Sequence, residues 1–147
     1  MGAYRTVVVG TDGSDSSMRA VDRAAQIAGA DAKLIIASAY LPHHEDTRAA
    51  DALGSESYKV SGTAPIYAIL QDAKDRAHAA GAKNVDERPI VGAPVDALVK
   101  LAEDEKADLL VVGNVGLSTI AGRLLGSVPA NVSRRAKVDV LIVHTTN

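Results

Sequence analysis

Short, uninterrupted apolar runs alternate along the whole chain with longer segments of helical periodicity. Residues 6–10 read TVVVG and residues 108–113 read DLLVVG, and neither run shows the polar alternation of a strand with one wet face. Such runs are typical of strands buried on both faces, which occur in parallel sheets covered by helices on both sides. The alternation therefore predicts a doubly wound α/β sandwich with right-handed crossovers.

Five strands and four helices are expected in strict alternation. The strands are predicted at residues 6–10, 33–40, 84–91, 108–113 and 138–144, and the helices at 14–29, 64–80, 94–106 and 127–137. The third strand contains Pro89, which has no N–H to donate to a ladder, so this strand is expected at a sheet edge. Residues 41–62 show no clear pattern and are too many for an ordinary connection, so a mobile segment or a lid is expected there.

Composition excludes several classes of protein. The 147 residues suit a single domain, 1–147, and a net charge of −2 argues against a nucleic-acid-binding face. The chain has no cysteine, so disulfides and thiolate metal sites are excluded. No window approaches the roughly 20 apolar residues of a membrane span, and the N-terminal apolar run is too short for a signal peptide. A cytoplasmic protein is expected.

A glycine-rich stretch joins the fourth predicted strand to the fourth helix. Gly113 and Gly116 let the backbone turn sharply and approach a ligand, and Gly126 and Ser127 open a helix whose first N–H groups can bind an anion. Arg123 could add a full positive charge. The stretch could therefore cradle phosphates although it lacks the lysine of a Walker motif. The alternative is that these glycines serve only turns and a helix start, and spacing alone leaves both open.

The second polar stretch, GTDGSDSS, follows the first strand from Gly10 to Ser17. Asp12 can accept hydrogen bonds from a ribose at the end of a strand in such a fold. Alternatively, Asp12 or Ser14 is a plain N-cap of the first helix. An aspartyl-phosphate nucleophile is excluded because Gly10 stands where that aspartate would be. If the first and fourth strands are neighbours, their loops face one pocket.

Histidines add no convincing metal site. His43, His44, Glu45 and Asp46 are metal-ligand types, but adjacent histidines on a loop point apart, so no metal site is predicted there. His144 is expected to be structural or interfacial.

These features together resemble the universal stress protein family. The family pattern Gly-x2-Gly-x9-Gly-Ser/Thr is matched at Gly113, Gly116, Gly126 and Ser127, and the expected aspartate after the first strand is Asp12. The resemblance covers almost the whole chain. It implies a five-stranded parallel sheet in the order 3-2-1-4-5, Rossmann-like and of the adenine nucleotide alpha hydrolase-like type.

The resemblance also implies an adenine nucleotide (ATP, AMP or cyclic AMP) between the first and fourth strands, with magnesium as an optional companion of ATP. Asp12 and Gly113 would face the ribose, the later motif residues would receive the phosphates, and backbone near Ala39 would read the adenine edge. The residues expected to line the site are Gly10, Thr11, Asp12, Ala39, Gly113, Gly116, Arg123, Gly126, Ser127 and Val128.

The resemblance further implies a homodimer through the last predicted strand, an apolar edge that begins at Val138 and ends at His144. Val115 and Gly122 depart from the residues common in members that bind ATP, which leaves room for a monophosphate or a cyclic nucleotide. The leading interpretation is a regulatory or nucleotide-sequestering protein of the stress response that is not an enzyme. The alternatives are a weak ATPase or phosphotransfer enzyme, and a partner-binding adaptor with a vestigial pocket.

Overall fold

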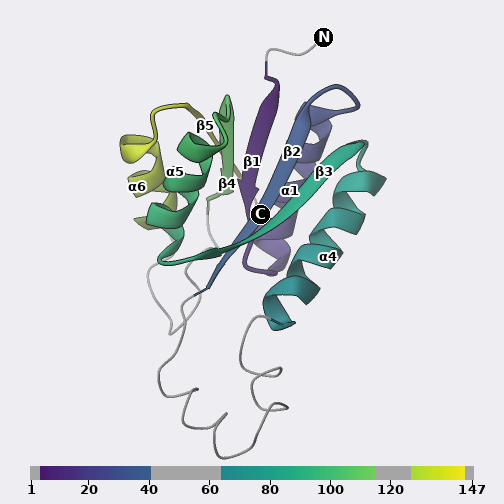
Figure 1. Cartoon of the computed structure of the whole chain (residues 1–147), viewed down its shortest axis with the longest axis horizontal. Coiled ribbons are helices and arrows are strands. Elements are labelled where there is room, and N and C mark those ends of the chain that lie inside the picture. Colours follow the sequence, from purple (N-terminus) through teal and green to yellow (C-terminus); the bar gives the residue numbers. More distant parts are fainter. Residues whose placement is uncertain (1–3, 41–63, 115–126, 145–147) are drawn as a thin grey trace, which may run out of the picture.

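The computed structural model of the chain describes residues 4–40, 64–114 and 127–144. Five parallel strands form one sheet in the order β3-β2-β1-β4-β5 (Figure 1). The predicted doubly wound sheet and the strand order implied by the family resemblance are both confirmed. The strands are β1 (Thr6–Gly10), β2 (Lys33–Tyr40), β3 (Asn84–Val91), β4 (Leu109–Gly113) and β5 (Asp139–Val143).

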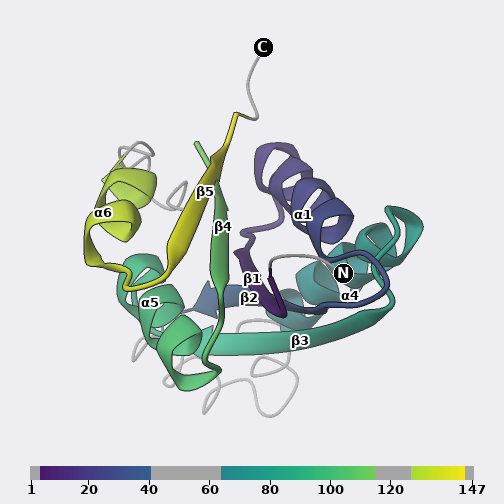
Figure 2. The same cartoon turned by 90° about the horizontal axis from the view of Figure 1, so that it is seen from above.

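Helices cover both faces of the sheet, as the alternation predicts. Seen from above in Figure 2, α1 and α4 lie on one side of the sheet, and α5 and α6 lie on the other. The helix bounds agree with the predicted ranges to within two residues at each end. The helices are α1 (Asp15–Ala28), α4 (Ala64–Ala79), α5 (Pro94–Asp104) and α6 (Ser127–Arg135).

Alternate residues of the central strands pack into two separate hydrophobic layers. In β1, Val7 and Val9 pack with α1 and α4, whereas Val8 packs with α5 and α6, and all three are fully buried. The helix facing β1 and β4 is rich in small side chains, which let its backbone lie close to the branched residues of the sheet. The buried alanines of α1 are Ala20, Ala24, Ala25 and Ala28.

A bidentate ion pair joins α4 to α1. Arg76 donates from Nε to Asp22 Oδ1 at 3.1 Å and from Nη2 to Asp22 Oδ2 at 2.6 Å. The hydrogen bond to Asp22 raises the pKa of Arg76 above its ordinary value. Because both side chains are about one-third exposed or more, the pair orients the helices more than it stabilises them.

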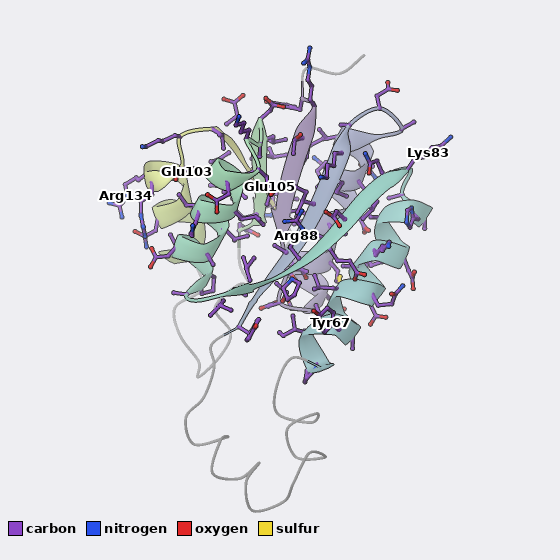
Figure 3. All side chains as sticks on the ribbon, viewed as in Figure 1. Tyr67, Lys83, Arg88, Glu103, Glu105 and Arg134 are labelled. Carbon is purple, nitrogen blue, oxygen red and sulfur yellow. The ribbon has the colours of Figure 1, made fainter. Side chains whose placement is uncertain are left out.

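The two edges of the sheet differ in character. β3 lies at one edge, as Pro89 predicts, and it carries charged residues on the face toward α5: Arg88 pairs with Asp86 at 3.0 Å and with Glu105, just after α5, at 3.4 Å. Figure 3 shows Arg88 and Glu105 in the space between β3 and α5. The opposite edge is β5, where Ile142 is 41% exposed. A charged, proline-containing edge resists pairing with another strand, whereas an apolar edge invites it.

Within the described ranges, no helix is both long enough and apolar enough to cross a membrane.

Candidate functional site

The carboxyl ends of β1 and β4 lie side by side at the centre of the sheet. Val9 of β1 is in register with Val111 of β4, and each strand then ends in a buried glycine, Gly10 and Gly113. From β1 the chain continues to β2 and β3 on one side, and it later returns to form β4 and β5 on the other. Ligands of doubly wound sheets bind at such a switch point, outside the carboxyl ends of the strands.

The first helix begins with a serine cap. Ser14 is the N-cap of α1, and its Oγ accepts a hydrogen bond from the N–H of Ser17 at 3.2 Å. The sequence offers both Asp12 and Ser14 as caps, and the structure assigns that role to Ser14. Asp12 instead accepts a hydrogen bond from the N–H of Ser14, the cap residue itself.

The Asp12 carboxylate is held in one orientation. Its Oδ1 accepts hydrogen bonds from the N–H of Ser14 and from Ser17 Oγ, both at 2.9 Å. The side chain is half-buried and lies two residues beyond the end of β1. A carboxylate fixed at the end of a central strand can accept hydrogen bonds from a ligand hydroxyl with little further loss of side-chain freedom.

Two buried hydroxyls lie beneath this carboxylate. Thr11 and Ser17 are 1% and 0% exposed, and their hydroxyl oxygens are 2.7 Å apart. Thr11 also extends the β1–β2 pairing, since its N–H donates to Ala37 O at 2.9 Å. Sequence reasoning did not single out Ser17. The signal available was the crowding of hydroxyl and carboxyl groups in GTDGSDSS, with Ser17 three residues after the cap.

A tight turn separates Asp12 from the cap. Gly13 has a φ of +87°, a backbone conformation that glycine adopts without steric cost. A Cβ at this position would lie 3.0 Å from Cγ1 and 3.1 Å from Cδ1 of Ile69, on α4. Gly13 is therefore required both by the turn and by the close approach of α4, so α4 supports the loop that carries Asp12.

The other predicted residues fall into two groups. Ala39 lies on β2, two residues beyond Ala37, the partner of Gly10, so it stands at the same carboxyl edge. Ser127 and Val128 begin α6, which connects two parallel strands and therefore starts at that edge. Three predicted phosphate-site residues lie outside the described residues: Gly116, Arg123 and Gly126. The histidine-containing segment 43–46 and the loop 41–62 also lie outside them.

The end of β4 is extended by one further hydrogen bond. The N–H of Asn114 donates to Val143 O at 2.9 Å, and its side-chain amide nitrogen lies 3.3 Å from Nδ1 of His144. His144 is exposed and takes part in this strand-end contact. Across the described ranges, no group of three or more metal-ligand side chains comes together.

A groove of about 450 Å³ lies at the end of the sheet opposite to Asp12, near the amino ends of β4 and β5. Inside it, the Tyr4 hydroxyl donates to Asp139 Oδ2 at 3.0 Å, which raises the pKa of Tyr4 above its ordinary value near 10. The groove is remote from Asp12, because the strands run the length of the sheet between them. Its lining residues are Tyr4, Ile27, Leu109, Asp139, Val140 and Leu141.

Comparison with known proteins gives consistent matches over nearly the whole chain. The model of the universal stress protein family matches residues 3–144. Universal stress protein Rv1636 of Mycobacterium tuberculosis is 89% identical over 146 residues, which cover 99% of this chain and 100% of that protein. A solved universal stress protein in complex with cAMP is 68% identical, with a TM-score of 0.76 over 99% of this chain and 100% of its own.

A more distant solved structure has the same fold. A universal stress protein family protein from Arabidopsis thaliana with AMP bound is 19% identical, with a TM-score of 0.69 over 97% of this chain and 92% of its own. At that identity the likeness concerns the fold alone.

Proposed function

Because the chain belongs to the universal stress protein family, we propose that it binds an adenine nucleotide at the carboxyl ends of β1 and β4. The observation that carries the proposal is the fixed carboxylate of Asp12, which two protein donors hold at the point where the strand order reverses. The relative in complex with cAMP, 68% identical over its whole chain, supports the same ligand class.

The proposed site divides the nucleotide among neighbouring elements. Asp12 and Gly113 face the ribose, because Gly113 ends β4 and Asp12 lies two residues beyond the end of β1, its neighbour in the sheet. Backbone near Ala39, on the next strand, reads the adenine edge. The phosphate lies at the start of α6, where unpaired N–H groups and the helix dipole favour an anion. The residues that we assign to that part of the site are Gly116, Arg123, Gly126, Ser127 and Val128.

Cyclic AMP is the nucleotide we place first. Its phosphate carries a single negative charge, which a helix N-terminus and backbone N–H groups can bind without a lysine. A triphosphate concentrates more charge and usually requires a lysine and a metal ion. The motif stretch from Gly113 to Ser127 contains no lysine, and Val115 is apolar.

We propose that binding, and not turnover, is the activity. Asp12 Oδ1 already accepts two hydrogen bonds from the protein, so this side chain is arranged as an acceptor for a ribose hydroxyl and not as a proton-abstracting base. A protein of this kind acts as a sensor or a reservoir of nucleotide. The family name suggests that the setting is a stress response.

We also propose that two copies pair through β5. The strand has an unpaired outer side among the described residues, and Ile142 on it is 41% exposed. Pairing two such edges would bury this side chain and satisfy the free backbone groups of both strands.

Titration calorimetry tests the proposed ligand. The protein is titrated with cyclic AMP, AMP and ATP, with and without magnesium, beside Asp12→Ala. Asp31→Ala is the matched control, because Asp31 is exposed before the start of β2, at the opposite edge of the sheet. We expect saturable binding that Asp12→Ala weakens and Asp31→Ala leaves unchanged.

A parallel assay of phosphate release from ATP distinguishes binding from turnover. Steady turnover that Asp12→Ala abolishes would make the protein an ATPase. A folded protein that binds none of these nucleotides would contradict the proposed site and favour an adaptor. A bound nucleotide should also raise the unfolding free energy, by roughly 2.7 kcal/mol at a hundredfold excess over Kd.

A further inference from the structure

The groove at the amino ends of β4 and β5 lies on the side of the sheet that α1 and α4 cover. α1 packs mainly on β1 and β4, and α4 packs mainly on β2 and β3, so neither helix is centred on β5 (Figure 2). The space between the last turn of α1 and β5 has a volume of about 450 Å³. Pockets that hold small molecules have volumes of roughly 300–1,000 Å³, so this groove is large enough for one.

Aliphatic side chains form most of the groove. Leu109 is 3% exposed and belongs to the hydrophobic layer on the α1 side of the sheet. Ile27 and Leu141 pack against that layer but are only half-buried, and Val140 also lines the groove. Covering the part of Ile27 and Leu141 that water still contacts would remove apolar area from water, which favours a ligand with an apolar body.

Tyr4 and Asp139 form a polar corner in this groove. The Tyr4 hydroxyl donates to Asp139 Oδ2 at 3.0 Å. Tyr4 precedes β1 and Asp139 begins β5, so the hydrogen bond passes across β4, which lies between these strands. The backbone next to Tyr4 is held as well, since the N–H groups of Arg5 and Thr6 donate to Asp108 Oδ2 at 2.9 and 3.1 Å. The phenol and the carboxylate therefore keep a defined position before any ligand arrives.

No cation of the described residues pairs with the charge of Asp139. The ion pairs of these ranges involve other carboxylates, and no lysine, arginine or histidine in them lies within ion-pairing distance of Asp139. The neutral hydroxyl of Tyr4 donates one hydrogen bond, whereas a carboxylate has about four acceptor positions. The groove thus combines an apolar wall with one oriented negative charge, and the complementary ligand is a cation.

We propose that this groove is a second binding site, which takes a small organic cation with a primary ammonium group on an apolar body. The ammonium donates to the Asp139 carboxylate beside the phenol of Tyr4, and the apolar body lies against Ile27 and Leu141. The groove has six lining residues, whereas a stable protein interface has roughly 20–30 on each side, so a small molecule fits better than a partner protein. The site lies at the opposite end of the sheet from Asp12 and does not depend on the proposed nucleotide function.

The test compares two ligands of nearly the same shape, phenethylamine and phenethyl alcohol, of which only the first carries a charge at neutral pH. Each is titrated into isotope-labelled protein, and binding is followed by the amide signals in two-dimensional NMR spectra. We expect saturable shifts at the lining residues, with the amine bound about tenfold or more tightly than the alcohol. This ratio is measured on the wild-type protein and requires no substitution.

Two substitutions locate the charge that the amine recognises. Asp139→Asn keeps the shape of the side chain and an acceptor for the Tyr4 hydroxyl but removes the charge, so the ratio should fall to about twofold or less. Asp72→Asn is the matched control, because Asp72 is an exposed carboxylate on α4, away from the groove, and the ratio should stay at the wild-type value.

Several outcomes would overturn the inference. Equal binding of the amine and the alcohol would show that the carboxylate does not select the ligand. Shifts that never saturate, or that fall on residues outside the groove, would show that no such site exists. Binding of the amine to a monomeric Ile142→Lys protein but not to the wild type would show that a second copy of the chain covers the groove, and the small-molecule site would then be wrong.

Discussion

Replacing Gly13 by alanine should destabilise the fold and weaken the nucleotide site together. The residue has a φ of +87°, and placing a Cβ in such a left-handed conformation costs roughly 1–2 kcal/mol. Alanine also restricts the unfolded chain, which offsets about 0.4–1 kcal/mol of that cost. The new Cβ would lie 3.0 Å from Cγ1 of Ile69, so this side chain must move, at about 0.5–1.5 kcal/mol if it leaves its rotamer.

The net loss of unfolding free energy should therefore be about 1–2 kcal/mol, which corresponds to a Tm lower by roughly 3–6 °C in a domain of this size. Urea unfolding followed by circular dichroism should give a lower midpoint at an unchanged slope. Because Gly13 lies between Asp12 and Ser14, the strain falls on the hydrogen bond between them, so the Kd for the nucleotide should rise as well.

A double-mutant cycle identifies the Ile69 contact. Ile69→Ala removes the atoms that the new Cβ would meet, so it should cost less in the Gly13→Ala background than in the wild type. Gly81→Ala is the control for the affinity, since Gly81 also has a positive φ, with open space around it and no part in the site. A Gly13→Ala protein with wild-type Tm and wild-type Kd would refute this reasoning, and equal costs of Ile69→Ala in both backgrounds would refute the contact.

Three further substitutions test other parts of the structure. Ile142→Lys places a charge on the exposed side of β5 and should convert the proposed dimer to a monomer in sedimentation equilibrium, whereas a protein that is monomeric before the change would exclude pairing there. Tyr4 should ionise at a higher pH than an ordinary tyrosine, because its hydrogen bond to Asp139 raises its pKa. The contribution of this hydrogen bond to folding stability is present below about pH 10 and is lost as pH rises through the pKa of Tyr4 in the folded protein. The difference in absorbance titration between wild type and Tyr4→Phe measures that pKa, and a midpoint at the ordinary value would contradict it. Arg88→Met should lower the unfolding free energy by less than about 1 kcal/mol, since its partners Asp86 and Glu105 are partly exposed, and a larger loss that persists in high salt would show that the pairs are not screened.

The strands and helices could be predicted because a strand that is buried on both faces has an uninterrupted apolar sequence. The run TVVVG has no polar alternation since β1 contributes to both hydrophobic layers, and Pro89 marked the edge strand because it cannot donate to a ladder. The order of the strands did not follow from alternation alone and came from the family resemblance. Alternation is compatible with several orders of a doubly wound sheet.

The sequence led us to expect that the loops after β1 and β4 lie side by side, but it did not predict the details of the loop after β1. Asp12 and Ser14 were equal candidates for the helix cap, because each residue type caps helices well. The choice depends on the burial of Ser17, and burial depends on how the whole loop folds back. The contact between Gly13 and Ile69 joins residues that are far apart in the sequence, and neither residue marks it locally.

The contrast between the two sheet edges limits how the protein can assemble. β3 carries Pro89 and the charged Asp86 and Arg88, whereas β5 carries the exposed Ile142. A chain with one sheet edge that can pair and one that resists pairing corresponds to a monofunctional unit in polymer chemistry, which can join only one other unit. Growth from such units stops after a single coupling, so the strand pairing that we propose through β5 would end in a closed pair and not in a fibre.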